Sequence, residues 1–193
     1  MVQSKMKKLL YIEEDFLNPS LCESFTDLHI KENDTFLEAV THSNENESLS
    51  YGPDVPEDDG NYGAEYLGGN VNQIQLNLTK DKLFANVIHK VTNLCKTFDD
   101  RVIIDYAGVV RWPVGTFMKP HIDPHRPDQE PDLFAAVLYL NDDYSGGYTG
   151  FEDCEVKPET GKLLIFSNSI YKHYVTKIEG SERFALSIWY NQK

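Results

Sequence analysis

From Asp100 onward, the sequence consists of short runs rich in β-branched and aromatic residues, with turn residues between them. These runs cover residues 102–112, 134–140, 161–166, 174–178 and 183–190. Short strands at such spacing are typical of β-sandwiches and β-barrels. We therefore predict that the C-terminal half of the chain folds into one of these two architectures.

The N-terminal half is predicted to be helical between short extended pieces. A candidate strand covers residues 10–16, and Asn18 and Pro19 then suit the N-cap and first position of a helix. The apolar face of that helix would be Leu21, Phe25 and Leu28. A second, longer helix is predicted over residues 79–98, with Thr79 as its N-cap and an apolar stripe at helical spacing.

Residues 44–70 are rich in glycine, proline, asparagine and acidic residues, and we expect a long loop there. Within it, residues 51–66 carry three tyrosines and five acidic side chains without a basic one. This segment is either a lid over a bound peptide or a solvated loop. The pattern shows no repeat and no linker, so we predict one domain over residues 1–193.

Charge and cysteine usage exclude several classes of protein. The 193 residues include 18 basic and 31 acidic side chains, for a formal net charge of −13, which disfavours a nucleic-acid partner. No apolar stretch is long enough to span a membrane. The three cysteines have no paired spacing, so we expect buried, reduced thiols and a cytoplasmic protein; they are Cys22, Cys95 and Cys154.

The segment His121-Ile122-Asp123 is the first candidate for chemistry. In an extended strand, residues i and i+2 point to the same side, so the imidazole and the carboxylate would converge. A simple surface contact between them is the alternative. If His173 folds back over this pair, two histidines and one carboxylate would form the arrangement used by non-haem Fe(II) oxygenases.

The last predicted strand places an arginine where an anion is needed. Alternation along residues 183–190 puts Phe184 on the core side and Arg183 on the other, together with Ser187. An inward-facing arginine binds an anion, for which a carboxylate is the natural partner. That carboxylate belongs either to a bound ligand or to an internal Asp or Glu.

The chain resembles the Fe(II)- and 2-oxoglutarate-dependent dioxygenases, in their prolyl 4-hydroxylase-like branch. The similarity covers nearly the whole chain and is weakest over residues 30–70. The motifs that carry it are Val109 to Gly115, Lys119-Pro120-His121-Ile122-Asp123, Tyr139-Leu140-Asn141, Gly146-Gly147 with Thr149 and Phe151, Gly161 to Phe166, His173, and the strand from Arg183 to Tyr190.

This resemblance implies a fold, a set of cofactors and a reaction. The fold would be mainly β with N-terminal helices around a double-stranded β-helix, which is a distorted jelly roll. Fe(II), 2-oxoglutarate and O2 would be used, with ascorbate as a further candidate cofactor, and succinate and CO2 released. The implied substrate is a prolyl residue in a peptide or protein.

The resemblance also implies roles for six residues. His121, Asp123 and His173 would bind Fe(II). Arg183 would hold the distal carboxylate of 2-oxoglutarate, with a hydrogen bond from Tyr139 and with Ser187 near the same pocket.

One departure from the family pattern and one nearby histidine need separate treatment. Trp112 stands where the branch usually has tyrosine, so the contacts of that phenol do not transfer. His125 follows a proline that marks the exit from the strand, and we expect it to be exposed or to lie on the substrate side.

Three alternatives to prolyl hydroxylation remain at this point. The first is hydroxylation of another target, such as a free amino acid or a small metabolite. The second is a metal-binding module without turnover, for which Arg183 would have no purpose. The third is an interaction module whose acidic face recruits basic partners.

Overall fold

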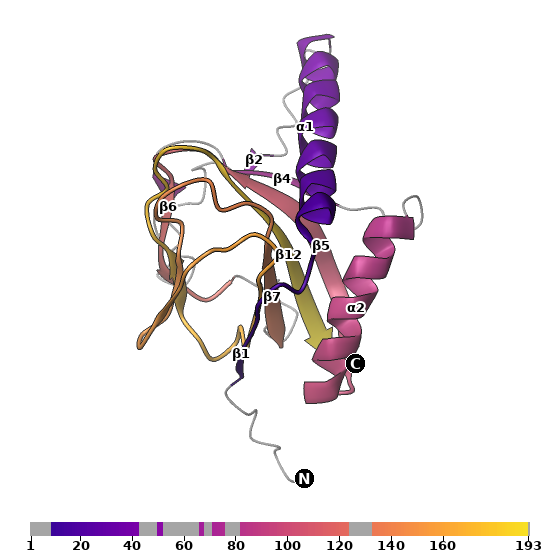
Figure 1. Cartoon of the computed structure of the whole chain (residues 1–193), viewed down its shortest axis with the longest axis vertical. Helices are drawn as coiled ribbons and strands as arrows, with labels where there is room; N and C mark the ends of the chain where they lie inside the picture. Colours follow the sequence, from indigo (N-terminus) through magenta and orange to yellow (C-terminus); the bar gives the residue numbers. More distant parts are fainter. Residues whose placement is uncertain are drawn as a thin grey trace.

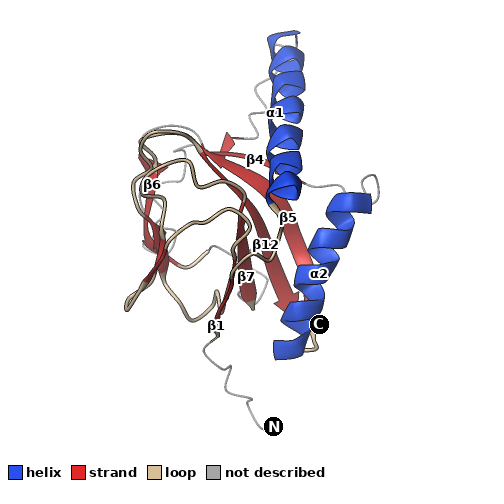
Figure 2. Cartoon of the chain, viewed as in Figure 1, coloured by secondary structure: helices blue, strands red, loops and turns tan. Residues whose placement is uncertain are grey.

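The protein is described here by a computed structural model that covers residues 9–42, 50–51, 66–67, 71–75, 82–123 and 133–192. Two antiparallel sheets face each other, and two helices cover the outer side of the larger sheet (Figures 1 and 2). The predicted architecture, mainly β with N-terminal helices and a jelly-roll core, is thereby confirmed.

The larger sheet has seven strands and the smaller has five. The order in the larger sheet is β1 (Leu10–Glu13), β10 (Leu163–Phe166), β7 (Phe134–Tyr139), β12 (Arg183–Gln192), β5 (Val102–Trp112), β4 (Val71–Gln75) and β2 (Ser50–Tyr51). The order in the smaller sheet is β3 (Tyr66–Leu67), β6 (Phe117–His121), β11 (His173–Val175), β8 (Thr149–Gly150) and β9 (Glu155–Val156).

The main core lies between the larger sheet and the helices α1 (Pro19–His42) and α2 (Lys82–Phe98). α1 begins as predicted, because the side chain of Asn18 accepts a hydrogen bond of 3.0 Å from the backbone N–H of Leu21. The two helices contact each other through the rings of Phe25 and Phe84, whose centroids are 4.2 Å apart. The two helices thus form a layer that packs against the outer side of the larger sheet.

The alternation predicted for β12 is confirmed. One set of its side chains packs in the core beneath the helices: Phe184, Leu186, Ile188 and Tyr190. The other set points between the two sheets, where apolar residues from β7, β10 and the smaller sheet meet. β12 lies between β5 and β7, so both of its edges are hydrogen-bonded. Pairing on both edges therefore fixes the positions of the polar side chains on its inner face.

The N-terminal half contains more strand than predicted. The strands β2 and β3 fall within residues 44–70, where we expected only a loop, and β4 follows directly. They are short pieces that gain their hydrogen bonds from β4, β5 and β6, so little in the local sequence marks them. β1 ends at Glu13 rather than at residue 16, and α1 runs to His42, well beyond the predicted apolar face.

The prediction of three buried cysteines needs a correction, and the predicted N-cap of α2 cannot be compared with the structure. Cys154 is exposed, in contrast to Cys22 and Cys95, which are buried as expected; all three are free thiols. Cys154 lies in the short connection between β8 and β9, where residues 152–155 are exposed. The predicted N-cap Thr79 lies outside the described residues, although α2 ends at Phe98 as predicted.

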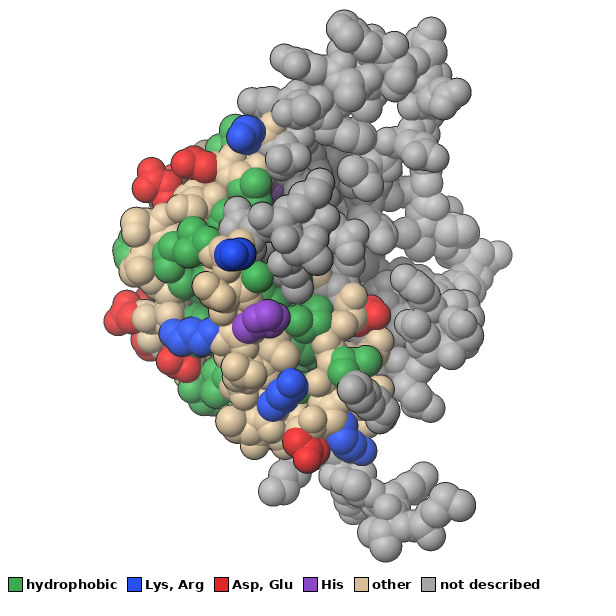
Figure 3. Space-filling model, turned by 90° about the vertical axis from the view of Figure 1, so that its right-hand side faces the viewer, with side chains coloured by type: hydrophobic (Ala, Val, Ile, Leu, Met, Phe, Trp, Pro, Cys, Tyr) green, Lys and Arg blue, Asp and Glu red, His purple; other side chains and the backbone are tan. Residues whose placement is uncertain are grey.

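Within the described ranges, no helix has both the length and the apolar character needed to cross a membrane. Acidic, basic and apolar side chains are interspersed on the side of the molecule shown in Figure 3. The single-domain organisation and the cytoplasmic localisation stay predictions.

We expect the helix–sheet core to dominate stability. Ile88 of α2 is fully buried, whereas Ile30 of α1 is 44% exposed. Ile88→Ala should lower the free energy of unfolding by about 2–5 kcal/mol, because it leaves a cavity in a packed layer. Ile30→Ala should cost much less, since little apolar area is lost. Urea unfolding of both variants measures the difference, and equal losses would contradict the assignment of this core.

Candidate active site

Two histidines from neighbouring strands of the smaller sheet lie directly opposite each other. His121 ends β6, His173 begins β11, and antiparallel pairing makes them register partners. Their ring centroids are 4.3 Å apart, and both residues are buried. Strand pairing thus brings together two imidazoles that are far apart in the sequence.

Asp123 completes a cluster with both histidines. Its Oδ1 lies 3.2 Å from Nε2 of His121 and 3.6 Å from Nε2 of His173. One potential ligand atom from each residue lies within 4.8 Å of the other two. Two imidazoles and one carboxylate that converge in this way match the ligand set of Fe(II) sites with open positions. The structure therefore brings the three predicted metal ligands together.

The position of Asp123 has a different cause from the one predicted. β6 ends at His121, so Asp123 lies beyond the strand, and strand alternation does not explain its contact with the histidine. Instead, the indole Nε1 of Trp189 on β12 donates a hydrogen bond of 2.8 Å to Oδ2 of Asp123. Oδ1 then faces the two histidines, while Oδ2 is held by the larger sheet.

A backbone carbonyl orients His121. Nδ1 of this ring lies 2.8 Å from the carbonyl oxygen of Lys119, which can only accept a hydrogen bond. Nδ1 therefore carries the proton, and Nε2 is the atom with a free lone pair for a metal. Sequence reasoning missed this carbonyl and the role of Trp189. Only the inward position of Trp189 on the alternating strand gave a signal.

The electrostatics of the cluster favour a metal over bound protons. Burial lowers the pKa of His173 to about 4, and His121 adds to this effect while Asp123 opposes it. Burial alone would raise the pKa of Asp123, but the two neighbouring imidazoles and the hydrogen bond from Trp189 outweigh it and hold the pKa at about 2. At neutral pH, His173 is thus neutral and Asp123 ionised, which are the forms that bind a metal.

Arg183 is buried on the inner face of the larger sheet, at the start of β12. Its Cζ lies 5.2 Å from the ring centroid of Trp112, its register partner on β5, and 5.4 Å from that of Tyr139. These ring faces attract a guanidinium, and the hydroxyl oxygen of Tyr139 also interacts with it. In the described part of the chain, no carboxylate pairs with Arg183, and its Nε is buried without a hydrogen-bond partner. The internal ion pair left open by the sequence is thus not found among these residues.

The other two predicted anchor residues lie on the same inner side. Tyr139 is fully buried on β7, and its hydroxyl donates a hydrogen bond of 2.7 Å to Oγ1 of Thr149 on β8. This bond joins the two sheets. Ser187 is buried two alternation steps along β12 from Arg183, in register with Val137 of β7.

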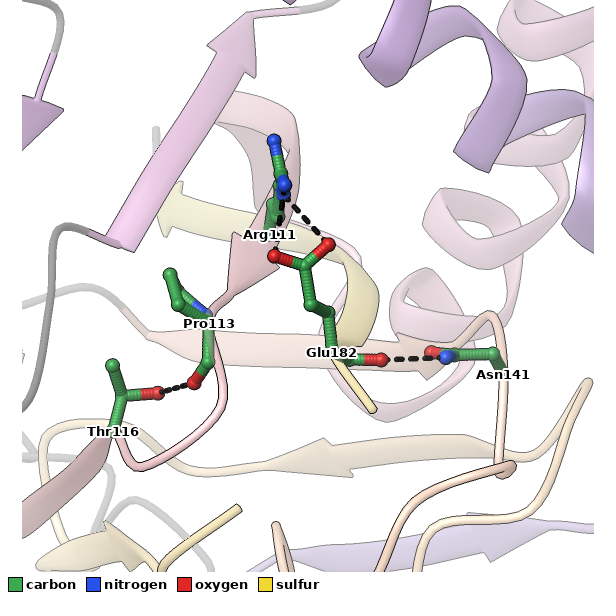
Figure 4. Close-up of polar contacts among 5 residues, drawn as sticks. All are labelled: Arg111, Pro113, Thr116, Asn141 and Glu182. Atoms are coloured by element: carbon green, nitrogen blue, oxygen red, sulfur yellow. Dashed lines mark hydrogen bonds and ion pairs between the residues drawn. The ribbon is translucent and has the colours of Figure 1, made fainter. Parts of the chain in front are cut away.

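The backbone on both sides of Arg183 is fixed by polar contacts, and Figure 4 shows those of Glu182 with Arg111 and Asn141. The Asn141 amide donates to the carbonyl of Glu182 and accepts from the N–H of Phe184, both at 2.7 Å. The Glu182 carboxylate accepts two hydrogen bonds from Arg111 on β5, at 2.8 and 3.0 Å. Arg183 thus leaves the sheet from a segment that is held from both neighbouring strands.

Two predicted features lie outside the described residues. His125 belongs to the segment after Asp123 that the structure does not describe. The predicted lid over residues 51–66 is described only at its two ends, in β2 and β3.

Comparison with known proteins finds one matching family model. The model of the 2OG-Fe(II) oxygenase superfamily matches residues 107–191, a stretch that contains the three-ligand cluster and Arg183. This part of the chain is therefore similar to the 2-oxoglutarate-dependent oxygenases. The family implies Fe(II), 2-oxoglutarate and O2, and the donor set of the cluster fits the metal. No curated protein matches the chain.

Solved structures share the fold at low sequence identity. A viral collagen prolyl hydroxylase from Paramecium Bursaria Chlorella virus-1, in a 2OG complex, has 14% identity and a TM-score of 0.67, covering 95% of this chain and 96% of that one. A prolyl-4-hydroxylase from Pseudomonas putida has 17% identity and a TM-score of 0.68, covering 95% and 92%. A prolyl hydroxylase from Trichoplax adhaerens, in complex with a peptide fragment of hypoxia inducible factor, has 16% identity and a TM-score of 0.66, covering 95% and 83%.

Trp189→Phe should weaken metal binding by roughly 10- to 100-fold, because Asp123 loses the bond that orients its carboxylate. Anaerobic calorimetric titration with Fe(II) or Mn(II) measures this loss. Trp112→Phe is the matched control, since Trp112 contacts Arg183 on the same inner face. Its metal affinity should equal that of the unmodified protein. Equal losses in the two variants would contradict the proposed contact.

Proposed function

We propose that the protein hydroxylates prolyl residues in a peptide or protein, with Fe(II) and 2-oxoglutarate as metal and co-substrate. The observation that carries this proposal is the combination of a two-histidine, one-carboxylate cluster with a buried arginine that has no carboxylate partner among the described residues and whose Nε lacks an acceptor. A plain structural metal site needs no such arginine. The proposal thus accounts for both features with one ligand set.

In this proposal, the smaller sheet supplies the two histidine ligands of the metal, and the larger sheet supplies the arginine that binds the co-substrate. His121, Asp123 and His173 bind the iron through Nε2, a carboxylate oxygen and Nε2. Arg183 holds the distal carboxylate of 2-oxoglutarate, because its planar fork matches a carboxylate and stays charged at any working pH. Burial of Arg183 excludes water, which strengthens that interaction.

When bound, iron and 2-oxoglutarate supply the oxidation: one atom of O2 enters succinate as CO2 leaves, and the other becomes the hydroxyl group on the substrate carbon. The protein contributes orientation. Trp189 keeps Oδ2 of Asp123 away from the histidines, and in the neutral His121 ring the Lys119 carbonyl accepts a hydrogen bond from Nδ1, which leaves the Nε2 lone pair for a metal. Both contacts preserve the ligand atoms in their metal-binding form.

The choice of prolyl substrate is supported by the shared fold with three prolyl hydroxylases, one of which binds a peptide. One fold serves many substrates, so the test must compare substrates directly. The protein is reconstituted anaerobically with Fe(II) and 2-oxoglutarate, then exposed to O2 with proline-rich peptides, the same peptides with alanine for proline, or free amino acids.

Mass spectrometry should show the gain of one oxygen atom on the proline peptides alone, with matching release of succinate. Ascorbate, which we propose as a further cofactor, is added in a parallel arm and should prolong turnover without changing the product. Modification of free amino acids but not of peptides would overturn the peptide substrate. Absence of succinate in every arm would overturn the proposed oxygenase reaction.

Each metal ligand should be required for turnover. His121→Ala, Asp123→Ala and His173→Ala should each abolish succinate formation and lower Fe(II) affinity, while far-ultraviolet circular dichroism stays unchanged. The matched control is His89→Ala, since this histidine is exposed on α2. Near-normal succinate formation in any one of the three variants would remove that residue from the ligand set.

Arg183→Ala should chiefly raise the concentration of 2-oxoglutarate that is required. Loss of a charge-assisted pair in a buried site typically costs about 2–5 kcal/mol, or roughly tens- to thousands-fold in affinity. Arg183→Lys should restore part of the affinity, because the charge survives and the fork is lost. Anaerobic binding titrations measure all three proteins. An unchanged affinity in Arg183→Ala would contradict its role as the anchor.

A further inference from the structure

The strand β1 forms one edge of the larger sheet (Figure 1). It pairs antiparallel with β10, and no other strand in the described part of the chain pairs with it. The free edge of such a strand carries a row of N–H and C=O groups that can bind a further strand. β1 is thus able to accept one.

The contacts of Leu9, the residue before β1, show which backbone groups point to the free edge. Its N–H donates to Oγ of Ser167, and its carbonyl accepts from the N–H of Ser167, both at 3.0 Å. Leu9 therefore bonds toward β10, and in an antiparallel pair this direction alternates from one residue to the next. The N–H and C=O groups of Leu10 and Ile12 consequently point to the free edge.

The side chain of Ile12 is also uncovered. It is 42% exposed, whereas Leu10 packs against the cluster between the sheets and Tyr11 packs against the core beneath the helices. Charged side chains on an edge strand oppose pairing with another chain, and both residues that point their backbone outward here are apolar. The local sequence of β1 therefore favours pairing.

The charges beside β1 favour a second copy of this chain in antiparallel orientation. Lys7 and Lys8 precede the strand in the sequence, and Glu13 and Glu14 end and follow it. Antiparallel pairing sets the basic end of one copy beside the acidic end of the other, whereas parallel pairing would bring like charges together. The side chain of Glu14 is 58% exposed, although Nζ of Lys162 lies 3.2 Å from its carboxylate.

We propose that β1 is the interface between two copies of this chain, which pair antiparallel about a two-fold axis at Tyr11. In this register, Leu10 of each copy lies opposite Ile12 of the other, so the outward N–H and C=O groups of both residues are paired. The exposed Ile12 side chain then packs against Leu10 across the two strands. The two larger sheets become one continuous sheet.

Analytical ultracentrifugation of the full chain tests this interface. It is run at about 0.15 M salt, where the repulsion between two copies of net charge −13 is screened beyond about 8 Å. The unmodified chain should show a monomer–dimer equilibrium with a Kd between roughly 1 µM and 1 mM, as expected for a small, transient interface.

Ile12→Pro should raise the dimer Kd roughly tenfold or more, because it removes an outward N–H. Its Tm should stay close to that of the unmodified chain, since the bonds of β1 to β10 remain. Ile12→Val is the matched control, because it keeps the N–H and the branched side chain, and its Kd should be unchanged. A monomer at every concentration, or equal Kd values for the two variants, would overturn the interface and leave this edge to a different partner.

Charge reversal tests the register and also decides the proposal if Ile12→Pro does not fold. Extension of the same register sets Lys8 of one copy opposite Glu14 of the other. Lys8→Glu and Glu14→Lys should each raise the dimer Kd roughly two- to tenfold, because like charges then lie opposite each other. The double variant should restore it. A double variant that dimerises no better than the single ones would overturn the two-fold register.

Discussion

His121 and His173 meet because β6 and β11 pair antiparallel with these two residues in register. The same dependence holds in the larger sheet, where Arg183 is opposite Trp112 and Tyr139 is opposite Ala185. A slip of one residue in either sheet would turn these side chains to the wrong face. Strand register therefore decides whether a metal site and an anion site exist at all.

Packing of the helices on the larger sheet makes a change of this register energetically unfavourable. Phe184, Leu186, Ile188 and Tyr190 pack beneath α1 and α2, and they alternate along β12 with the residues that face the active site. Any shift of register that moved Arg183 to the outer face would also move apolar residues of this core to the inner face. The apolar outer layer thus enforces the position of the polar inner one. Fold stability and site geometry depend on the same alternation.

The parts of the structure that were predictable from sequence are those with strong local patterns. The alternation of β12, the apolar stripe of α2 and the Asn18 cap all produce such patterns, and the structure has them. The short strands β2 and β3 owe their existence to partners elsewhere in the chain, so the local sequence does not reveal them.

The site was predictable to the extent that residue types reveal ligands. The two histidines and Asp123 were found in this way, although the reasoning placed Asp123 on a strand that ends before it. The contact of Trp189 with Asp123 depends on which groups lie opposite each other in space. Such contacts leave no trace in spacing.

The amide of Asn141 and the Arg111–Glu182 pair have a consequence for the entropy of binding. They immobilise the backbone around Arg183 during folding, through hydrogen bonds to both flanking residues. A long, flexible cation would otherwise lose backbone and rotamer freedom when its ligand arrived, and that loss would subtract from affinity. Here much of the ordering is complete before any ligand binds. The arginine side chain is thus presented by a rigid segment, and if it binds 2-oxoglutarate as proposed, more of the electrostatic attraction between guanidinium and carboxylate would be retained as binding free energy.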